Sequence, residues 1–474
     1  MPASESSAVR DALTALVASA AARLDGIRDA RLISDTDLAI VQDHLARNYE
    51  FSIPMDSDAL IGDVIEMLQR WDLDSTHPRY FGLFNPPALP VTAAADALVA
   101  MLNPQVGTRT HAPAANAIED HVLRLFIRRL GFPEGSGGHF TSGGQEANTS
   151  AVAIALTRLH PVVLEDGLRG LSGAPRLYVS EHAHHSFVKA ARFLGLGARA
   201  VRHVASDRDG RMQPDALACL VEADRKAGDL PFLIVATAGT TSIGSIDPIA
   251  ELAPYAKAEA LWLHTDAAWG GSALMSDRLR PHLAGIECSD SVTWDAHKWL
   301  DVPMGAGMLL LRAFAASEPV FHTDTGYVPQ AEQGAAEPYQ YTFQWSRRFI
   351  GLKVFMALAS VSAPGYARLV EGQAERAEQL RNKLRERGWR IINSTPFPLV
   401  CFTDTRLEKQ GARAVEHLVS RVQARGLAWI STVSTPHHGT LVRACITSYD
   451  TRESDLDVLV DELEACRGDA ITTK

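Results

Sequence analysis

One lysine of this chain stands in an unusually apolar setting for a charged side chain. Lys298 lies in "SVTWDAHKWLDVPMGAG", residues 291–307, directly behind His297 and between tryptophans. Lysine is normally solvated, and many lysines in such segments only extend their ammonium group to the surface. In an apolar pocket, however, a lysine loses its proton more easily and can act as a nucleophile. Lys298 is therefore a candidate for a covalent bond to a carbonyl compound.

A second candidate is a carboxylate at the end of an apolar run. Asp266 follows "ALWLHT" and precedes two alanines. A buried carboxylate needs a positive or hydrogen-bonding partner, and the protonated nitrogen of a pyridine ring is one such partner. The competing interpretation is that Asp266 caps the helix that follows.

A third segment could hold a phosphate group. In "TSGGQEANTSAVAIAL", residues 141–156, Ser142, Gly143 and Gly144 precede a predicted helix. Backbone N–H groups at the positive end of a helix suit an anion. A capping box between Ser142 and Gln145 explains the same residues without any ligand.

Two further loops follow predicted strands. "SEHAHHS" offers His182, His184 and His185, but no cysteine or second histidine motif nearby completes a metal site. A surface loop, or one imidazole lying flat on an aromatic ligand, explains this cluster better. In "ATAGTTSIGSIDP", residues 236–248, small residues and hydroxyls would let a ligand approach the backbone, although a plain turn fits equally well.

The elements that position these residues alternate along the chain. Apolar runs at 176–180, 232–239, 260–268 and 307–313 predict buried strands, and helical patterns lie between several of them. This alternation predicts an α/β fold with a mostly parallel sheet covered by helices on both faces. Ligands of such sheets bind at the carboxyl ends of the strands, where the candidates above fall. Together they describe a site for pyridoxal 5′-phosphate.

The chain is long enough for more than one domain. We expect a helical N-terminal segment over residues 1–85, a large cofactor-binding domain over 86–365 and a small α+β domain over 366–474. "GLGARA", residues 195–200, fits a dinucleotide-binding pattern only nominally, because it follows a helix and precedes a strand.

Composition excludes several other classes of protein. The 474 residues carry a net charge of −10, which disfavours a nucleic-acid or anionic-membrane surface. Five scattered cysteines suit a reducing compartment. The apolar run 12–22 is too short to span a membrane and is typical of an amphipathic helix. We therefore expect a cytoplasmic protein without a metal site.

With these motifs, the sequence resembles the pyridoxal-phosphate-dependent group II decarboxylases, which include aromatic-L-amino-acid, glutamate, histidine and 2,4-diaminobutyrate decarboxylases. The similarity runs from "HPRYFGLF" to "LVRACITS" and rests on the order and spacing of the motifs above. It implies fold type I, the aspartate aminotransferase-like fold of pyridoxal-phosphate enzymes, and a homodimer whose active sites are shared. Residues 101–113, "MLNPQVGTRTHAP", would then lie at the interface.

The resemblance also implies roles for single residues. In "DAHKW", Lys298 matches the lysine that binds the cofactor, while Asp266 matches the acid that pairs with the pyridine nitrogen. His184 matches the histidine stacked on the ring. The other cofactor-binding matches are Ser142, Gly143, Gly144, Thr237, Ala268, Asp295 and His297. The family often has asparagine where Asp295 stands, so an aspartate there needs a proton or another donor between itself and the phosphate.

The reaction implied is decarboxylation of an L-amino acid through an external aldimine and a quinonoid. Tyr327, in "FHTDTGYVPQ", matches the tyrosine that protonates the product, and Arg347 matches the arginine that meets the substrate carboxylate, with Arg348 the weaker match. An aminotransferase, or an aldehyde synthase on the same fold, remains the alternative.

The substrate stays open on the sequence alone. "HPRYFGLFNPP" is expected to line the side-chain pocket, so that Tyr80 and Phe81 would contact the substrate. These aromatics could favour an aromatic side chain or belong to the core. Arg79 could favour an acidic side chain or form a structural ion pair.

Overall fold

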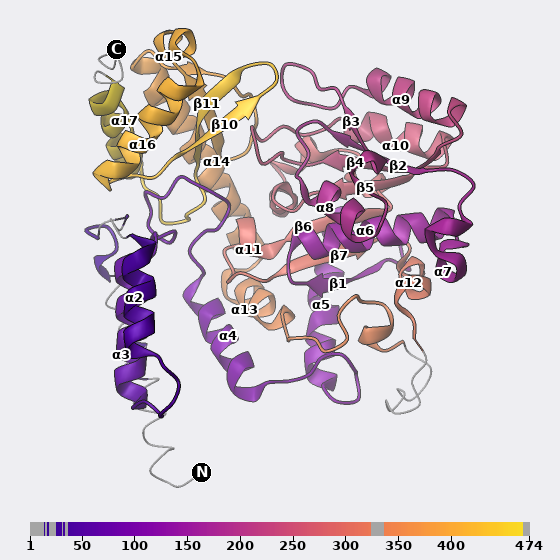
Figure 1. Cartoon of the computed structure of the whole chain (residues 1–474), viewed down its shortest axis with the longest axis horizontal. Helices are drawn as coiled ribbons and strands as arrows, with labels where there is room; N and C mark the ends of the chain where they lie inside the picture. The colour runs from indigo at the N-terminus through magenta and orange to yellow at the C-terminus, as the bar shows by residue number, and fades with distance from the viewer. Residues whose placement is uncertain are drawn as a thin grey trace.

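The computed structural model describes residues 14, 17–18, 25–30, 32–33, 37–323 and 336–467. Their centre is a seven-stranded sheet of order β1-β7-β6-β5-β4-β2-β3, and a second sheet of order β10-β11-β9-β8 lies beside it (Figure 1). The strands of the large sheet are β1 (Gly137–Thr141), β2 (Pro175–Ser180), β3 (Val201–Val204), β4 (Leu230–Thr237), β5 (Trp262–Asp266), β6 (Ser291–Asp295) and β7 (Gly307–Leu311).

The large sheet is mixed but mostly parallel. Strands β3, β2, β4, β5 and β6 pair in parallel, whereas β7 is antiparallel to both β6 and β1. Each of the four predicted apolar runs forms a strand, which confirms the α/β prediction. The short strands β1, β3 and β6 were not predicted.

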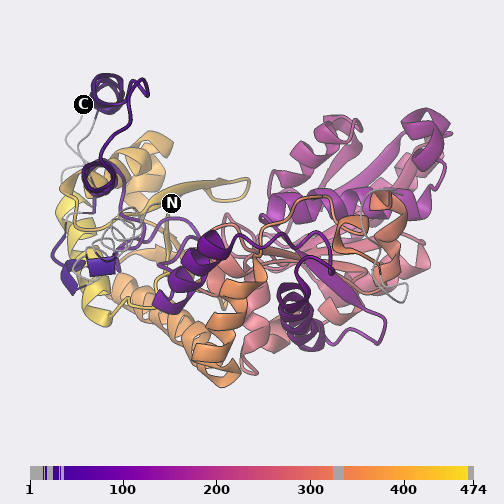
Figure 2. The ribbon, with the colours of Figure 1, turned by 90° about the horizontal axis from the view of Figure 1, so that it is seen from below.

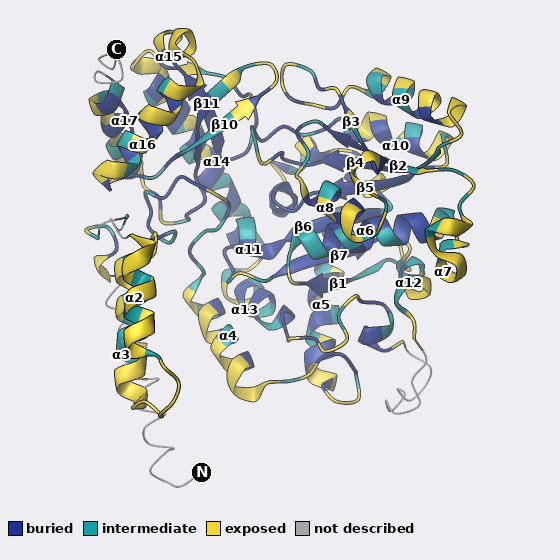
Figure 3. Ribbon diagram, in the orientation of Figure 1, coloured by how far each residue is buried: buried dark blue, intermediate teal, exposed yellow. Residues whose placement is uncertain are grey.

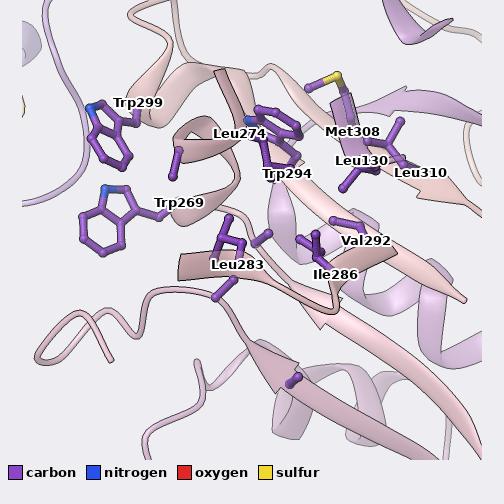
Figure 4. Packing of buried hydrophobic residues seen from close by; sticks show 14 of the residues in the cluster. Leu130, Trp269, Leu274, Leu283, Ile286, Val292, Trp294, Trp299, Met308 and Leu310 are labelled. Atoms are coloured by element: carbon purple, nitrogen blue, oxygen red, sulfur yellow. The ribbon is translucent and has the colours of Figure 1, made fainter. Parts of the chain in front are cut away.

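Side chains of the central strands alternate between two cores, one on each face of the sheet. On β4, Ile234 and Ala236 join one core, whereas Leu233 and Val235 join the other. Because both faces are covered, β4 is apolar from Leu230 to Ala236, as expected for a strand of a buried parallel sheet. Figure 4 shows the first core around Trp294, next to Val292 of the same strand.

Helices connect the strands and cover both faces (Figure 1). The helices of this part are α4 (Pro90–Leu102), α5 (Pro113–Leu130), α6 (Gly144–Leu159), α7 (Val163–Asp166), α8 (Ser186–Phe193), α9 (Pro214–Lys226), α10 (Ile249–Ala258), α11 (Ala296–Trp299), α12 (Glu318–Phe321) and α13 (Gly351–Val361). Proline opens α4, α5 and α9, where its missing N–H costs no intrahelical bond.

The small sheet and its helices form the C-terminal part. Its strands are β8 (Arg390–Ile391), β9 (Leu399–Thr403), β10 (Ser431–Thr435) and β11 (Gly439–Cys445), and its helices are α15 (Thr405–Gln410), α16 (Ala412–Arg425) and α17 (Glu453–Arg467). All pairings in this sheet are antiparallel. The prediction of a smaller α+β unit near the C-terminus is confirmed in its architecture.

One helix joins the two parts. Helix α14 (Ala363–Glu386) crosses the predicted boundary at residue 366. Tyr366 and Val370 pack in the core of the large sheet, whereas Leu380 and Leu384 pack in the core of the small sheet. The boundary itself stays a prediction, because a single helix contributes to both cores.

The N-terminal helices lie at the edge of the molecule. Helices α2 (Leu38–Asn48) and α3 (Ser57–Trp71) contain no buried residue and are coloured mostly as exposed in Figure 3. Figure 2 shows them at the edge of the molecule, away from the large sheet. Residues 72–89 contain no helix, and the extent of the N-terminal segment predicted over 1–85 stays a prediction. No helix of the described residues combines the length and the hydrophobicity that crossing a bilayer would require.

Candidate active site

The carboxyl ends of β4, β5 and β6 open into a cavity of about 320 Å³. Its walls include all the cofactor-binding residues that the sequence singled out: Ser142, Gly143, Gly144, His184, Thr237, Asp266, Ala268, Asp295, His297 and Lys298. The other residues of the walls are Gln145, Asn148, Gly239, Thr241 and Trp269. Residues more than 150 positions apart thus meet at one edge of the sheet. This is the place where open parallel sheets bind ligands.

Lys298 is held at the cavity by its own helical turn and by a carboxylate. It lies on α11, which directly follows β6, and its Nζ atom is 3.1 Å from Asp295 Oδ2. The next residue, Trp299, is buried and stacks on Trp269 of the cavity wall at 5.7 Å between ring centroids (Figure 4). The apolar surroundings noted in the sequence are therefore those of Trp299, while the lysine amine faces an ionisable partner.

Asp266 ends β5 and is fixed on both oxygens. Oδ1 accepts from the Ala268 N–H at 3.1 Å, and Oδ2 accepts from Asn148 Nδ2 at 3.0 Å. The 3-10 helix that follows, Gly270–Met275, has Trp269 at its N-cap position and no side-chain cap hydrogen bond, so the alternative of Asp266 as a helix cap is wrong. A carboxylate fixed in this way can accept a hydrogen bond from a protonated ring nitrogen, and its fixed direction would set the orientation of that ring.

Asn148 belongs to a buried hydrogen-bond network that the sequence did not reveal. Its Oδ1 accepts from Thr293 Oγ1 at 2.7 Å and lies 3.1 Å from His264 Nε2. Burial lowers the pKa of His264 to about 4, so the ring is neutral at neutral pH. A signal was present in the sequence, because an asparagine in the alanine-rich stretch "EANTSAVAIAL" is out of place unless its amide is bonded.

His184 is the one histidine of its loop that lines the cavity. Its Nδ1 accepts from the Ser186 N–H at 3.2 Å, and burial, the largest effect, lowers its pKa. The ring is therefore neutral and oriented by α8. His182 lies 3.2 Å from Ser242 Oγ instead, and His185 directly precedes α8.

The turn before α6 packs so closely against Asp295 and β7 that side chains would not fit there. A Cβ on Gly144 would lie 2.8 Å from Asp295 Oδ2, and one on Gly307 would lie 2.6 Å from the Gly143 backbone. Ser142 bonds to Glu146 through N and Oγ, at 2.9 and 2.6 Å, and not to Gln145. The hydrogen-bond partner of Ser142 is thus one residue later in the sequence than the capping box predicted.

Two polar atoms at the cavity lack partners. Thr237 Oγ1 and Asp295 Oδ1 are buried without a hydrogen bond in the described part of the chain. Such atoms are rare in native proteins and fit a polar ligand that bonds to both. With the glycine turn, the Asp266 carboxylate and the Lys298 amine, the donor and acceptor set matches pyridoxal 5′-phosphate.

The predicted substrate-binding residues lie outside the walls of this cavity. Arg347 is buried and donates to Glu119 Oε2 at 3.1 Å, and the exposed Arg348 lies 3.3 Å from Asp96. Tyr80 stacks on Trp429, and Phe81 belongs to the core of the small sheet. The structure does not bring these four side chains to the cavity, and their roles stay predictions. Tyr327 lies outside the described residues.

The comparison with protein families shows which family this chain belongs to. Residues 43–404 match the family described as the pyridoxal-dependent decarboxylase conserved domain. That span covers most of the chain, and the chain belongs to this family. The protein is therefore a pyridoxal-phosphate-dependent amino acid decarboxylase, a carboxy-lyase, and pyridoxal 5′-phosphate is its cofactor.

Curated relatives and solved structures agree with this assignment. The chain is 31% identical over 420 residues to an acidic amino acid decarboxylase of Bos taurus, which covers 83% of this chain and 78% of that protein. It is 30% identical over 411 residues to the cysteine sulfinic acid decarboxylase of Homo sapiens, covering 83% of both. The crystal structure of mouse CSAD superposes with a TM-score of 0.91 at 26% identity, covering 98% of this chain and 99% of that one.

Proposed function

We propose that this enzyme removes the α-carboxylate of an L-amino acid with an acidic side chain and releases the amine, with Tyr327 as the proton donor. The observation that carries the reaction is the meeting of Lys298, Asp266 and the Gly143–Gly144 turn in one cavity. The bound cofactor supplies an electron sink for the bond that breaks. The residues of the chain must bind it, orient the substrate and supply one proton.

Each residue has a definite task in this proposal. Lys298 would hold the cofactor through its amine, and Asp266 would keep the ring nitrogen protonated by accepting a hydrogen bond from its N–H group. Asn148 holds the Asp266 carboxylate still. His184 packs its neutral ring against the aromatic ligand, and the backbone N–H groups before α6 bind the phosphate. Tyr327 then delivers a proton to Cα of the product, as general acid.

An arginine close to the cavity supports the acidic substrate. Arg443 is 3% exposed, and no carboxylate of the described residues pairs with it. Its Nε donates to the Thr241 carbonyl at 3.0 Å, and Thr241 is part of the cavity wall. The Nη2 atom is buried without a partner. A buried cation that lacks an anion is costly, and a side-chain carboxylate or sulfinate would provide one.

The relatives support the same class of substrate. The names of two of them give acidic amino acids or cysteine sulfinic acid as substrates. The aromatic alternative loses support, because Tyr80 and Phe81 pack on Trp429 and in the core of the small sheet. An L-2,4-diaminobutyrate decarboxylase of Rhizobium meliloti, 34% identical over 296 residues, makes a basic substrate the competing case.

The proposed assembly is a homodimer with shared active sites. Helices α2 and α3 expose apolar side chains such as Leu38, Ile40 and Leu68, with none buried. Met101 and Leu102, in the segment expected at the interface, are also largely exposed. A second copy would cover these surfaces. We place the enzyme in the reducing cytoplasm, since its five cysteines are unpaired.

The test has three parts. The purified protein should absorb in the visible range, and borohydride reduction should attach the cofactor to the peptide that contains Lys298. Carbon dioxide release should be highest with L-aspartate, L-glutamate or cysteine sulfinate among common L-amino acids. Addition of a keto acid should leave the product an amine. Formation of a new amino acid from the keto acid would instead identify an aminotransferase.

A further inference from the structure

Three hydrogen bonds converge on one oxygen of Glu146, in the first turn of α6. The Oε2 atom accepts from the Ser142 N–H at 2.9 Å, from Ser142 Oγ at 2.6 Å and from Gln344 Nε2 at 2.7 Å. The Oε1 atom is buried without a hydrogen bond in the described part of the chain. The carboxylate is therefore held through Oε2 and by the positive end of the helix.

Ser142 uses both of its donors on this carboxylate. A serine hydroxyl has one hydrogen, and the hydroxyl and the backbone N–H of Ser142 both donate to Glu146. Ser142 begins the turn of residues 142–145, which lines the cavity. In this arrangement Ser142 shapes the turn, and its hydroxyl is not free to donate to an anion.

Gln344 comes from a segment that has its own contacts outside this turn. The carbonyl oxygen of Gln344 lies 2.8 Å from Oγ1 of the buried Thr342. The ring of the next residue, Trp345, stacks on Tyr339 at 4.6 Å between ring centroids. The amide of Gln344 thus connects Glu146 to a part of the fold that lies outside α6 and its turn.

We propose that Gln344 is a positioning residue for the cofactor. The amide fixes the Glu146 carboxylate, which fixes Ser142 and with it the turn that lines the cavity. Gln344 itself is outside the cavity walls, so it acts through Glu146. Without the amide the turn would have more conformations, and ordering it when the cofactor binds would cost free energy. This inference rests on the assignment of this cavity as the cofactor site.

Titration of the cofactor-free full chain with pyridoxal 5′-phosphate tests the proposal. Gln344→Ala should raise the dissociation constant about three- to tenfold, the effect of one typical hydrogen bond. In a Glu146→Ala background the same substitution should change the constant less than about twofold, because the amide acts through Glu146. Equal effects in the two backgrounds would overturn the proposal, since Gln344 would then act by another route.

Exchanging the two side chains provides a rescue. Gln344→Glu alone places a second carboxylate against Glu146, so the dissociation constant should rise more than in Gln344→Ala. When Glu146→Gln is added, the new amide at position 146 can donate to the new carboxylate at position 344, while its oxygen accepts from Ser142. The combined variant should return to within about threefold of the wild type. A combined variant that binds no better than Gln344→Glu would contradict the proposal.

Gln340→Ala is the matched control. Gln340 is a glutamine of the same segment, and its Oε1 atom accepts from the Glu337 N–H at 2.8 Å. This variant should leave the dissociation constant at the wild-type value. An increase equal to that of Gln344→Ala would show that loosening of the segment, and not the contact with Glu146, causes the effect.

Hydrogen exchange gives a readout that needs no cofactor. In the cofactor-free chain the Ser142 N–H is bonded to Glu146. Its exchange should become about three- to tenfold faster in Gln344→Ala and should stay unchanged in Gln340→Ala, as measured by mass spectrometry with fragmentation. Unchanged exchange in Gln344→Ala overturns the inference even if the cofactor binds normally. That failure is thus distinct from a failure of the chain to bind the cofactor.

Discussion

Asn148 on α6 donates a hydrogen bond to Asp266 at the end of β5, with 3.0 Å between Nδ2 and Oδ2. The same amide also donates to Ser186 Oγ at 2.9 Å, while its oxygen accepts from Thr293. One side chain thus connects the acid of the site, the helix that follows the His184 loop and strand β6. Because both of its hydrogens are used, Asp266 has a fixed direction before any ligand binds.

Replacing Asn148 should weaken the cofactor site without unfolding the protein. A hydrogen bond to a charged group is worth about 1.5–3 kcal/mol, so Asn148→Ala should raise the dissociation constant for pyridoxal 5′-phosphate about tenfold to hundredfold. A fluorescence titration measures it. Thr149→Ala, which removes a bond to Gln145 on the same helix, is the control. An unchanged constant would show that Asp266 does not depend on this amide.

Arg347 and Glu119 form an ion pair whose side chains are 3% and 4% exposed. Glu119→Met should lower the free energy of unfolding by about 3–5 kcal/mol, because it leaves a buried cation without its partner. Glu119→Met with Arg347→Met should recover most of that loss, yet it should remain inactive if Arg347 binds the substrate carboxylate. Urea unfolding and steady-state kinetics separate the two effects. Wild-type kinetics in the double variant would restrict Arg347 to a structural role.

Three buried histidines should make the protein sensitive to acid. Burial lowers the pKa of His77 and His264 to about 4 and that of His139 to about 3. The unfolded chain takes up these protons near pH 6.5, and the folded chain does not. Stability is therefore present above pH 6.5 and is lost as the pH falls towards 4, by about 1.4 kcal/mol per pH unit for each histidine.

His139 allows that slope to be tested at one residue. Neither of its ring nitrogens has a partner among the described residues, so His139→Leu removes no hydrogen bond. The variant should match the wild type at pH 7 within about 1 kcal/mol and should lose stability less steeply between pH 6.5 and 5. Urea unfolding at each pH measures this. Parallel curves for both proteins would contradict the assignment.

Tyr327→Phe should redirect the product. Without the phenol, the proton needed at Cα is not delivered, and reaction with oxygen should yield an aldehyde in place of part of the amine. Chromatography of the products, with measurement of oxygen consumption, distinguishes the two outcomes. Tyr339, which is buried against Trp345, provides the control Tyr339→Phe. An unchanged yield of amine from Tyr327→Phe would remove that tyrosine from the reaction.

The sequence predicted the strand-end residues of the site because each follows a long apolar run. Thr237 ends a strand that is buried from Phe232 onward, and Asp266 ends a strand that is buried throughout; such runs are visible without a structure. The strands β1 and β6, which were not predicted, lack a continuous apolar run. β1 begins with two glycines, which are disfavoured in strands, and β6, "SVTWD", mixes serine, threonine and aspartate with its apolar residues.

Contacts between distant segments could not be predicted in the same way. The Asn148 network, the position of Gly307 between Thr141 and Asp295, and the pairing of Arg347 with Glu119 depend on strand order and register. A local sequence pattern contains neither the strand order nor the register. Phe81 is the converse case, because an aromatic residue beside a predicted pocket has the same local pattern as one in a core, and it lies in the core of the small sheet.

Helix α14 has a consequence for how variants of this enzyme will behave. Its first half packs in the core of the large sheet and its second half in the core of the small sheet. A substitution that weakens the packing of either half therefore destabilises both cores. Substitutions at Tyr366 or Leu384, far from the cofactor, should therefore reduce how much enzyme accumulates in a cell rather than how fast each surviving molecule turns over.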